Sequence, residues 1–124
     1  MSLQPAVKLT GETVGDPEPI GTITINGTTY TKKRLIIKTP TLPTAGGTLD
    51  IPLDFTHNAI LSIHGTTNNT SGYCHPLPYI NLNNSGQIVG GISLQYRGSN
   101  EKLIRIVATS DMSSHYAFIT IEYY

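Results

Sequence analysis

The sequence is poor in several features that usually mark a function. It has one cysteine, Cys74, so an internal disulfide is excluded. Charged residues make up 13% of the chain and the formal net charge is zero, so we expect no nucleic-acid partner. Apolar runs fall far short of the roughly 20 residues that cross a bilayer, so membrane insertion is not expected. The first residues lack a signal-peptide pattern, which predicts synthesis in the cytoplasm.

The chain is instead rich in Thr, Ser, Asn and Gly, which suit the solvent-facing side and the turns of a sheet protein. A chain of 124 residues suits one domain, because two smaller cores would each lie near the limit of independent stability. Residues 1–19 end in the proline-rich run Gly15–Pro19 and are predicted to form an N-terminal arm or linker. Residues 20–124 are predicted to form a single β-sandwich domain.

From residue 20 onward, short segments of alternating or continuous apolar character are separated by turn residues. The expected strands are 20–25, 28–39, 48–55, 59–64, 73–82 (irregular), 87–96, 102–108 and 116–124. The pattern predicts an all-β fold, an antiparallel, jelly-roll-like sandwich of about 7–8 short strands. The last of these strands is expected to lie in the middle of a sheet.

Two of the expected strands, 28–39 and 102–108, are apolar on both faces. Such a strand has to be covered on both sides. Contact with another subunit and a well-covered sandwich core both explain this pattern.

Catalytic and metal-binding signatures are not found. Four histidines are present: His57, His64, His75 and His115. They lack the spacings that place two imidazoles on one face for a metal. Asp50 and Asp54 lie about 13 Å apart along one extended strand, too far for a glycosidase pair. We therefore predict no catalytic, cofactor-binding or metal-ligating residue and expect that the protein is not an enzyme.

Tyrosine is the dominant aromatic residue, with seven Tyr against two Phe and no Trp. Its ring offers an apolar face and a polar tip, which suits stacking on sugars or closing an interface. The candidate receptor- or partner-binding residues lie near predicted loops: Tyr73, His75, Tyr79, Tyr96, Arg97, His115 and Tyr116. If those loops gather at one end of the sandwich, they form a polar-aromatic surface suited to glycans or protein. The alternative is that these tyrosines fill half-exposed strand positions.

Four segments carry a family resemblance: 59–65 (AILSIHG), 73–81, 103–107 (LIRIV) and the terminal 117–124 (AFITIEYY). Together they resemble the small C-terminal tip domains of bacteriophage tail fibres and related virion proteins. Those domains commonly end on an aliphatic strand that closes with Glu or Gln and then Tyr. The resemblance covers roughly residues 20–124. A long shaft normally precedes such a tip, whereas here a short proline-rich arm does.

The resemblance implies a structural protein of a bacteriophage virion, made in the host cytoplasm and assembled as a homotrimer. It implies host attachment through a cell-surface glycan, or contact with other virion proteins. The missing shaft favours a stand-alone knob, a short tail or baseplate component, or a capsid decoration protein. In the decoration or head-fibre alternative, the arm from Pro5 to Pro19 would grip the shell. A monomeric carbohydrate-binding module is the other alternative. The family has no fixed receptor residues, so none is transferred.

Overall fold

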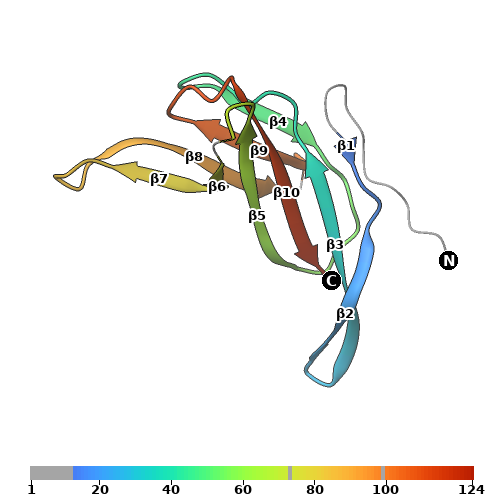
Figure 1. Cartoon of the computed structure of the whole chain (residues 1–124). Helices are drawn as coiled ribbons and strands as arrows, with labels where there is room; N and C mark the ends of the chain where they lie inside the picture. The colour runs from blue at the N-terminus through green and yellow to red at the C-terminus, as the bar shows by residue number, and fades with distance from the viewer. Residues whose placement is uncertain (1–12, 73, 99) are drawn as a thin grey trace.

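The computed structural model describes residues 13–72, 74–98 and 100–124. Every regular element in these residues is a strand, and no helix among them is long and apolar enough to cross a membrane. The strands are β1 (Thr13–Val14), β2 (Glu18–Ile25), β3 (Thr28–Lys38), β4 (Thr48–Pro52), β5 (Ile60–Asn69), β6 (His75–Leu77), β7 (Tyr79–Leu82), β8 (Ile88–Arg97), β9 (Leu103–Ala108) and β10 (His115–Tyr123). The predicted all-β antiparallel sandwich is confirmed (Figure 1).

The larger sheet has six strands, in the order β1-β3-β10-β5-β6, with β2 also paired to β3. As predicted, the C-terminal strand β10 lies in the middle, between β3 and β5. Its residue Ile119 is in register with Ile37 on one side and with Gly65 on the other. The central strand is therefore hydrogen-bonded on both edges along most of its length.

The smaller sheet has four strands, in the order β4-β9-β8-β7. The chain changes sheet four times, from β3 to β4, from β4 to β5, from β6 to β7 and from β9 to β10. As a result β3 pairs with β10 in one sheet while β4 pairs with β9 in the other. This double pairing is the jelly-roll-like part of the fold. The remaining pairs join strands that are consecutive in the chain: β5 pairs with β6, β7 with β8 and β8 with β9, all antiparallel.

The core lies between the sheets and is built from alternate residues of each strand. In β10, Ala117, Ile119 and Ile121 are fully buried, while Phe118 between them points outward and is 42% exposed. Burying one aliphatic side chain of this size stabilises the fold by about 1.5–3 kcal/mol. The other sheet contributes, among others, Ile51, Leu53, Ile92, Ile104 and Ile106. Inward and outward residues alternate along both β4 and β10.

Several strands differ from the prediction. The segment predicted as one irregular strand over 73–82 is two strands, β6 and β7, which belong to different sheets. β4 ends at Pro52 rather than at residue 55. The two-residue β1 and the three-residue β6 are too short to show a hydrophobic period, and without them eight strands remain. β5 is longer than predicted, because it continues through Gly65 to Asn69, where the sequence predicts a polar loop. These polar residues stay extended because β10 and β6 both hydrogen-bond to them.

Part of the predicted N-terminal arm belongs to the sheet. Residues 1–12 lie outside the described residues. Beyond them, β1 pairs with the end of β3, and the Gly15 N–H donates to the Ile36 carbonyl at 3.0 Å. Glu18 and Pro19 already belong to β2, which accepts a proline because β2 is an edge strand. Residues 13–19 therefore lie along the edge of β3 that does not pair with β10.

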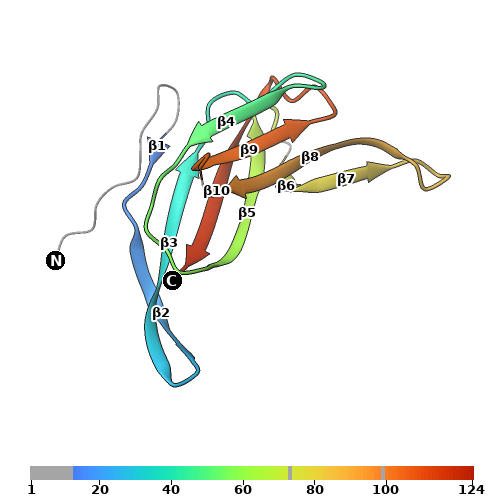
Figure 2. The same cartoon turned by 180° about the vertical axis from the view of Figure 1, so that it is seen from behind.

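Two hairpins extend beyond the sandwich, as Figures 1 and 2 show from opposite sides. One is formed by β2 and the first half of β3, with its turn at Asn26-Gly27. The other is formed by β7 and the first residues of β8, with its turn at residues 83–86. We call residues 80–90 of the second hairpin the β7–β8 arm. A two-stranded hairpin is at best marginally stable alone in water, so both hairpins gain from a surface to pack on.

The outer face of the four-stranded sheet is held by ion pairs. Arg105 on β9 donates two hydrogen bonds to the Asp50 carboxylate on β4, at 2.8 and 2.9 Å. This bidentate hydrogen bonding, before any other cause, lowers the pKa of Asp50. Lys102 pairs with Asp54 at 3.4 Å farther along the same edge. The face is therefore polar and internally paired.

Asp50→Asn is expected to lower the free energy of unfolding at neutral pH by up to about 1 kcal/mol, because the pair is surface-exposed. The folded pKa of Asp50 lies below its unfolded value, so its contribution is complete above about pH 4 and is lost as the pH falls through the folded pKa. Urea unfolding of wild type and variant should therefore differ at about pH 7 and converge in strong acid. A difference that persists unchanged in acid would contradict this assignment.

Candidate functional site

Three of the predicted binding residues meet at one end of the sandwich. His75 lies on β6, Tyr79 begins β7 and His115 begins β10. Asn69, at the end of β5, and the buried Met112 complete the group. We call these five residues the end cluster. They come together because β5 is in register with β10 at Asn69 and His115, and with β6 at Thr67 and His75.

The exposed part of the end cluster is a stacked ring pair. The His75 and Tyr79 ring centroids are 5.1 Å apart with an angle of 24° between the planes. The Tyr79 hydroxyl donates to the Met112 sulfur at 3.7 Å, so it is directed toward the buried side. His75 itself is exposed. The cluster therefore offers solvent an imidazole face that a second ring supports from beneath.

His115 is held at both ring nitrogens. The Asn69 amide nitrogen lies 3.1 Å from Nε2, and Ser114 Oγ lies 3.2 Å from Nδ1. These two contacts fix the orientation of the His115 ring.

The surroundings of the end cluster are polar. The His115 ring lies 6.3 Å from the His75 ring. The nearby Asp111 carboxylate has its pKa lowered, first by a hydrogen bond from the Ser113 side chain and then by one from the Ser113 backbone. A stacked ring beside hydroxyl, amide and carboxylate groups is the chemistry that binds a sugar: the ring contacts the apolar face of a pyranose and the polar groups bind its hydroxyls. The stacked rings and their polar neighbours are suited to binding a ligand of this kind.

The structure does not bring Tyr96, Arg97 or Tyr116 to the end cluster. Tyr73 lies outside the described residues. Tyr96 is half-buried, with its ring 5.3 Å from Phe55 and 5.6 Å from His57. Burial, and secondarily the charge of Asp54, raises the pKa of Tyr96. Tyr96 therefore belongs to the edge of the core, as in the alternative of half-exposed strand tyrosines.

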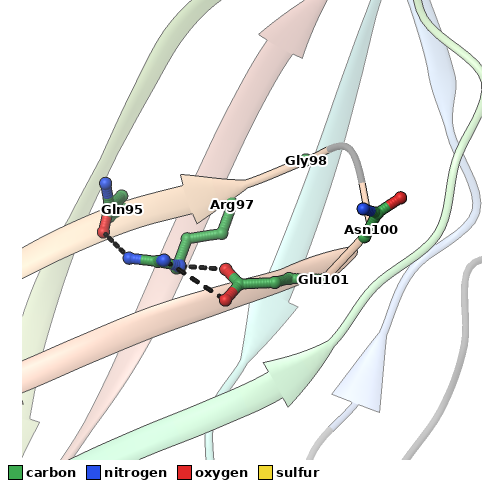
Figure 3. Close-up of a pocket in the computed structure, with 5 residues that line it drawn as sticks. All are labelled: Gln95, Arg97, Gly98, Asn100 and Glu101. Carbon is green, nitrogen blue, oxygen red and sulfur yellow. Dashed lines mark hydrogen bonds and ion pairs between the residues drawn. The ribbon is translucent and has the colours of Figure 1, made fainter.

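Arg97 lies on a shallow pocket of about 420 Å³, shown in Figure 3. The pocket is lined by Gln95, Arg97, Gly98, Asn100 and Glu101. The Arg97 guanidinium is already engaged, because it pairs with Glu101 through two nitrogens and donates to Gln95 at 3.2 Å. The Arg97 partnership also lowers the pKa of Glu101. Arg97 stabilises its own turn in this arrangement and has few donors left for a ligand.

Tyr116 faces outward from β10, on the opposite side of the strand from His115. Its ring contacts Phe118 at 5.9 Å, and Lys38 Nζ lies 5.1 Å from its centroid. Phe118 is 42% exposed and Ile36, on the neighbouring β3, is 45% exposed. We call Ile36, Lys38, Tyr116 and Phe118 the outer patch. It places two large exposed apolar side chains, Ile36 and Phe118, on the outer face of the six-stranded sheet.

The outer patch was not predicted as a site, although a signal for it was present. The segment Leu35-Ile36-Ile37 is apolar on both faces of its strand. In the structure Leu35 and Ile37 are fully buried, whereas Ile36 is uncovered within the chain. Asn69 and Met112 were missed as well, because Asn69 was assigned to a loop. Among the described residues, no group of three or more metal-ligating side chains is close enough to hold an ion.

The fold and this surface define the chain as an antiparallel β-sandwich with a polar-aromatic end cluster and an apolar outer patch. Comparison with protein-family models, with curated proteins and with solved structures finds no match.

Proposed function

We propose that the protein is a structural component of a bacteriophage or prophage virion, of the fibre-knob or tail-tip type. In this role it assembles as a homotrimer and binds a host-surface glycan or another virion protein. The observation that carries the proposal is the apolar surface that one chain leaves uncovered, at Ile36 and Phe118 on a sheet face and at Leu82 on the β7–β8 arm. Large apolar side chains in such exposed groups are typical of surfaces that meet another protein.

The end cluster supports the binding half of the proposal. Its His75–Tyr79 stack and its polar neighbours have the composition of a glycan site. It lies at the opposite end of β10 from the C-terminus (Figure 1).

The test of assembly is the solution mass, measured by light scattering after size exclusion. We expect three times the 13.4 kDa of one chain. A monomer that binds sugar would instead favour the carbohydrate-binding module. A monomer that binds phage capsids would favour the decoration alternative.

The test of binding uses fluorescently labelled protein on candidate host cells and on an array of bacterial glycans. His75→Ala and Tyr79→Phe form an informative pair, because the first removes the exposed ring while the second removes only the inward-directed hydroxyl. We expect His75→Ala to weaken binding at least about tenfold, the effect of losing 1.4 kcal/mol of contact. Tyr79→Phe should bind like wild type. Equal binding by wild type and His75→Ala would rule out the end cluster as the glycan site.

A further inference from the structure

We propose that Asn26 is a site of spontaneous covalent modification, at which the side-chain amide is lost and an aspartate or isoaspartate residue is formed. Asn26-Gly27 is the one Asn-Gly pair in the sequence, and it forms the tip of the β2–β3 hairpin. The inference goes beyond the proposed function and is independent of it, because it involves neither the end cluster nor the outer patch.

The chemistry needs only the chain and water. The Gly27 backbone nitrogen gives up its proton and attacks Cγ, the carbonyl carbon of the Asn26 side chain. The new N–C bond closes a succinimide ring, and the bond from Cγ to the amide nitrogen breaks, so that ammonia leaves. Water then opens the ring. Attack of water at Cγ gives aspartate, and attack at the backbone carbonyl carbon gives isoaspartate. Either product carries a new carboxylate.

The hairpin tip presents the attacking nitrogen without a competing hydrogen bond. β2 and β3 stay in register as far as Ile25 and Thr28, so Asn26 and Gly27 alone form the turn. Both are exposed, and both have positive φ, 49° and 82°. Within the part of the chain that the structure describes, neither the Gly27 N–H nor the Asn26 side chain has a hydrogen-bond partner. No hydrogen bond therefore has to break at either reacting group.

The surroundings of the tip leave room for ring closure. A Cβ built on Gly27 would meet no atom within 4 Å, so the approach to its nitrogen is through solvent. Ring closure requires the backbone to rotate at Asn26, which opens the turn. The hairpin projects from the sandwich (Figures 1 and 2). The end of a two-stranded hairpin is only marginally stable, so this local opening costs little free energy.

Asn84 is the matched comparison within the same chain. It too is exposed in the turn of a projecting hairpin, and the small residue Ser85 follows it. The Ser85 N–H, however, donates to the Asn83 side-chain oxygen at 2.9 Å. The nitrogen that would attack the Asn84 side chain is thus engaged in the folded protein. The structure therefore protects Asn84 and leaves Asn26 open to reaction.

The modification changes both the charge and the turn. Each converted tip adds one negative charge to a chain whose formal net charge is zero. Isoaspartate routes the backbone through Cβ and so lengthens a two-residue turn whose conformation depends on positive φ at both residues. We expect the pairing of Ile25 with Thr28 to loosen, while the sandwich keeps its structure.

The experiment follows loss of the amide in the folded chain and in the same chain unfolded in urea. Protein is aged at mildly alkaline pH in water enriched in heavy oxygen, which labels every newly formed carboxylate. Mass spectrometry of a proteolytic digest then gives the rates at Asn26 and at Asn84. We expect the ratio of the Asn26 rate to the Asn84 rate to be at least about tenfold larger in the folded chain than in the unfolded chain.

Comparing the two ratios removes the intrinsic difference between Asn-Gly and Asn-Ser, so the result reports on the fold. An equal ratio in both states would overturn the role assigned to the free Gly27 nitrogen. An Asn26 that keeps its amide in the folded chain, while it reacts in the unfolded chain, would show that the turn protects it and would overturn the site itself.

Two variants give a readout that does not depend on the digest. Asn26→Gln keeps an amide but places it one methylene farther from the Gly27 nitrogen, which disfavours ring closure. On isoelectric focusing, aged wild type should become more acidic and move toward Asn26→Asp, whereas aged Asn26→Gln should not shift. Circular dichroism establishes that both variants are folded. An Asn26→Gln protein that acidifies as fast as wild type would place the modification elsewhere in the chain and contradict the inference.

Discussion

Gly65→Ala is expected to prevent the chain from folding. A Cβ at this position would lie 2.5 Å from the Phe118 carbonyl oxygen and 3.4 Å from Ile119 Cα. Both atoms belong to the backbone of β10, the central strand, so no flexible side chain can move aside. Relief would require separating β5 from β10 where Gly65 is in register with Ile119. The cost exceeds about 4–5 kcal/mol, which approaches the whole stability of a small domain.

The measurement is urea unfolding with far-ultraviolet circular dichroism on Gly65→Ala and on a matched glycine variant. Gly98→Ala is the control, because its new Cβ would meet only Tyr96 Cε1 at an ordinary 3.5 Å and Gly98 has no positive φ. We expect the control to stay within about 1 kcal/mol of wild type. A Gly65→Ala protein that unfolds cooperatively with nearly wild-type stability would show that β5 does not approach β10 this closely.

The same contact explains why β5 was predicted too short. A glycine followed by Thr-Thr-Asn-Asn has the composition of a loop, and an isolated sequence gives no reason to extend it. In the sheet, Gly65 is needed for the close approach to β10, and Thr67 is buried with its hydroxyl against the His75 backbone. The strand is specified by its two neighbours rather than by its own residues. Tertiary pairing of this kind is invisible in a local pattern.

Most of the fold could be predicted because alternation of apolar and polar residues is a local property. β4 and β10 each show a period of two, and their inward residues, such as Ile51 and Ile119, are fully buried. Pro52 lies on β4, an edge strand, where a proline is tolerated. The order of the strands in the two sheets could not be predicted from the sequence, because several sandwich topologies share the same pattern of strand segments.

The candidate site was predicted only in part, for a reason that strand geometry makes plain. Successive side chains of a strand point to opposite faces. Neighbours in sequence, such as His115 with Tyr116 and Tyr96 with Arg97, therefore go to different surfaces. His75, Tyr79 and His115 meet because three strands end at the same place, which sequence alone does not disclose. The outer patch depends likewise on β3 and β10 being neighbours.

The second large effect is expected at Thr39, just beyond the end of β3. Its side chain is 2% exposed, and its hydroxyl accepts a hydrogen bond from the Ala117 N–H and donates one to the Pro40 carbonyl, both at 2.8 Å. Thr39→Val keeps the shape and removes both bonds, which leaves the Ala117 N–H in the core without this acceptor. We expect the free energy of unfolding to fall by about 2–4 kcal/mol.

The control that isolates the hydroxyl is Thr39→Ser, which keeps the two hydrogen bonds and loses one methyl group. Its expected cost is about 1 kcal/mol, the value of one buried methylene-sized group. Urea unfolding of the two variants side by side should therefore place serine well above valine in stability, although valine is the more apolar residue and the better strand former. The opposite order would mean that apolar packing, and not the hydroxyl bridge from Thr39 to Ala117, joins the end of β3 to the start of β10.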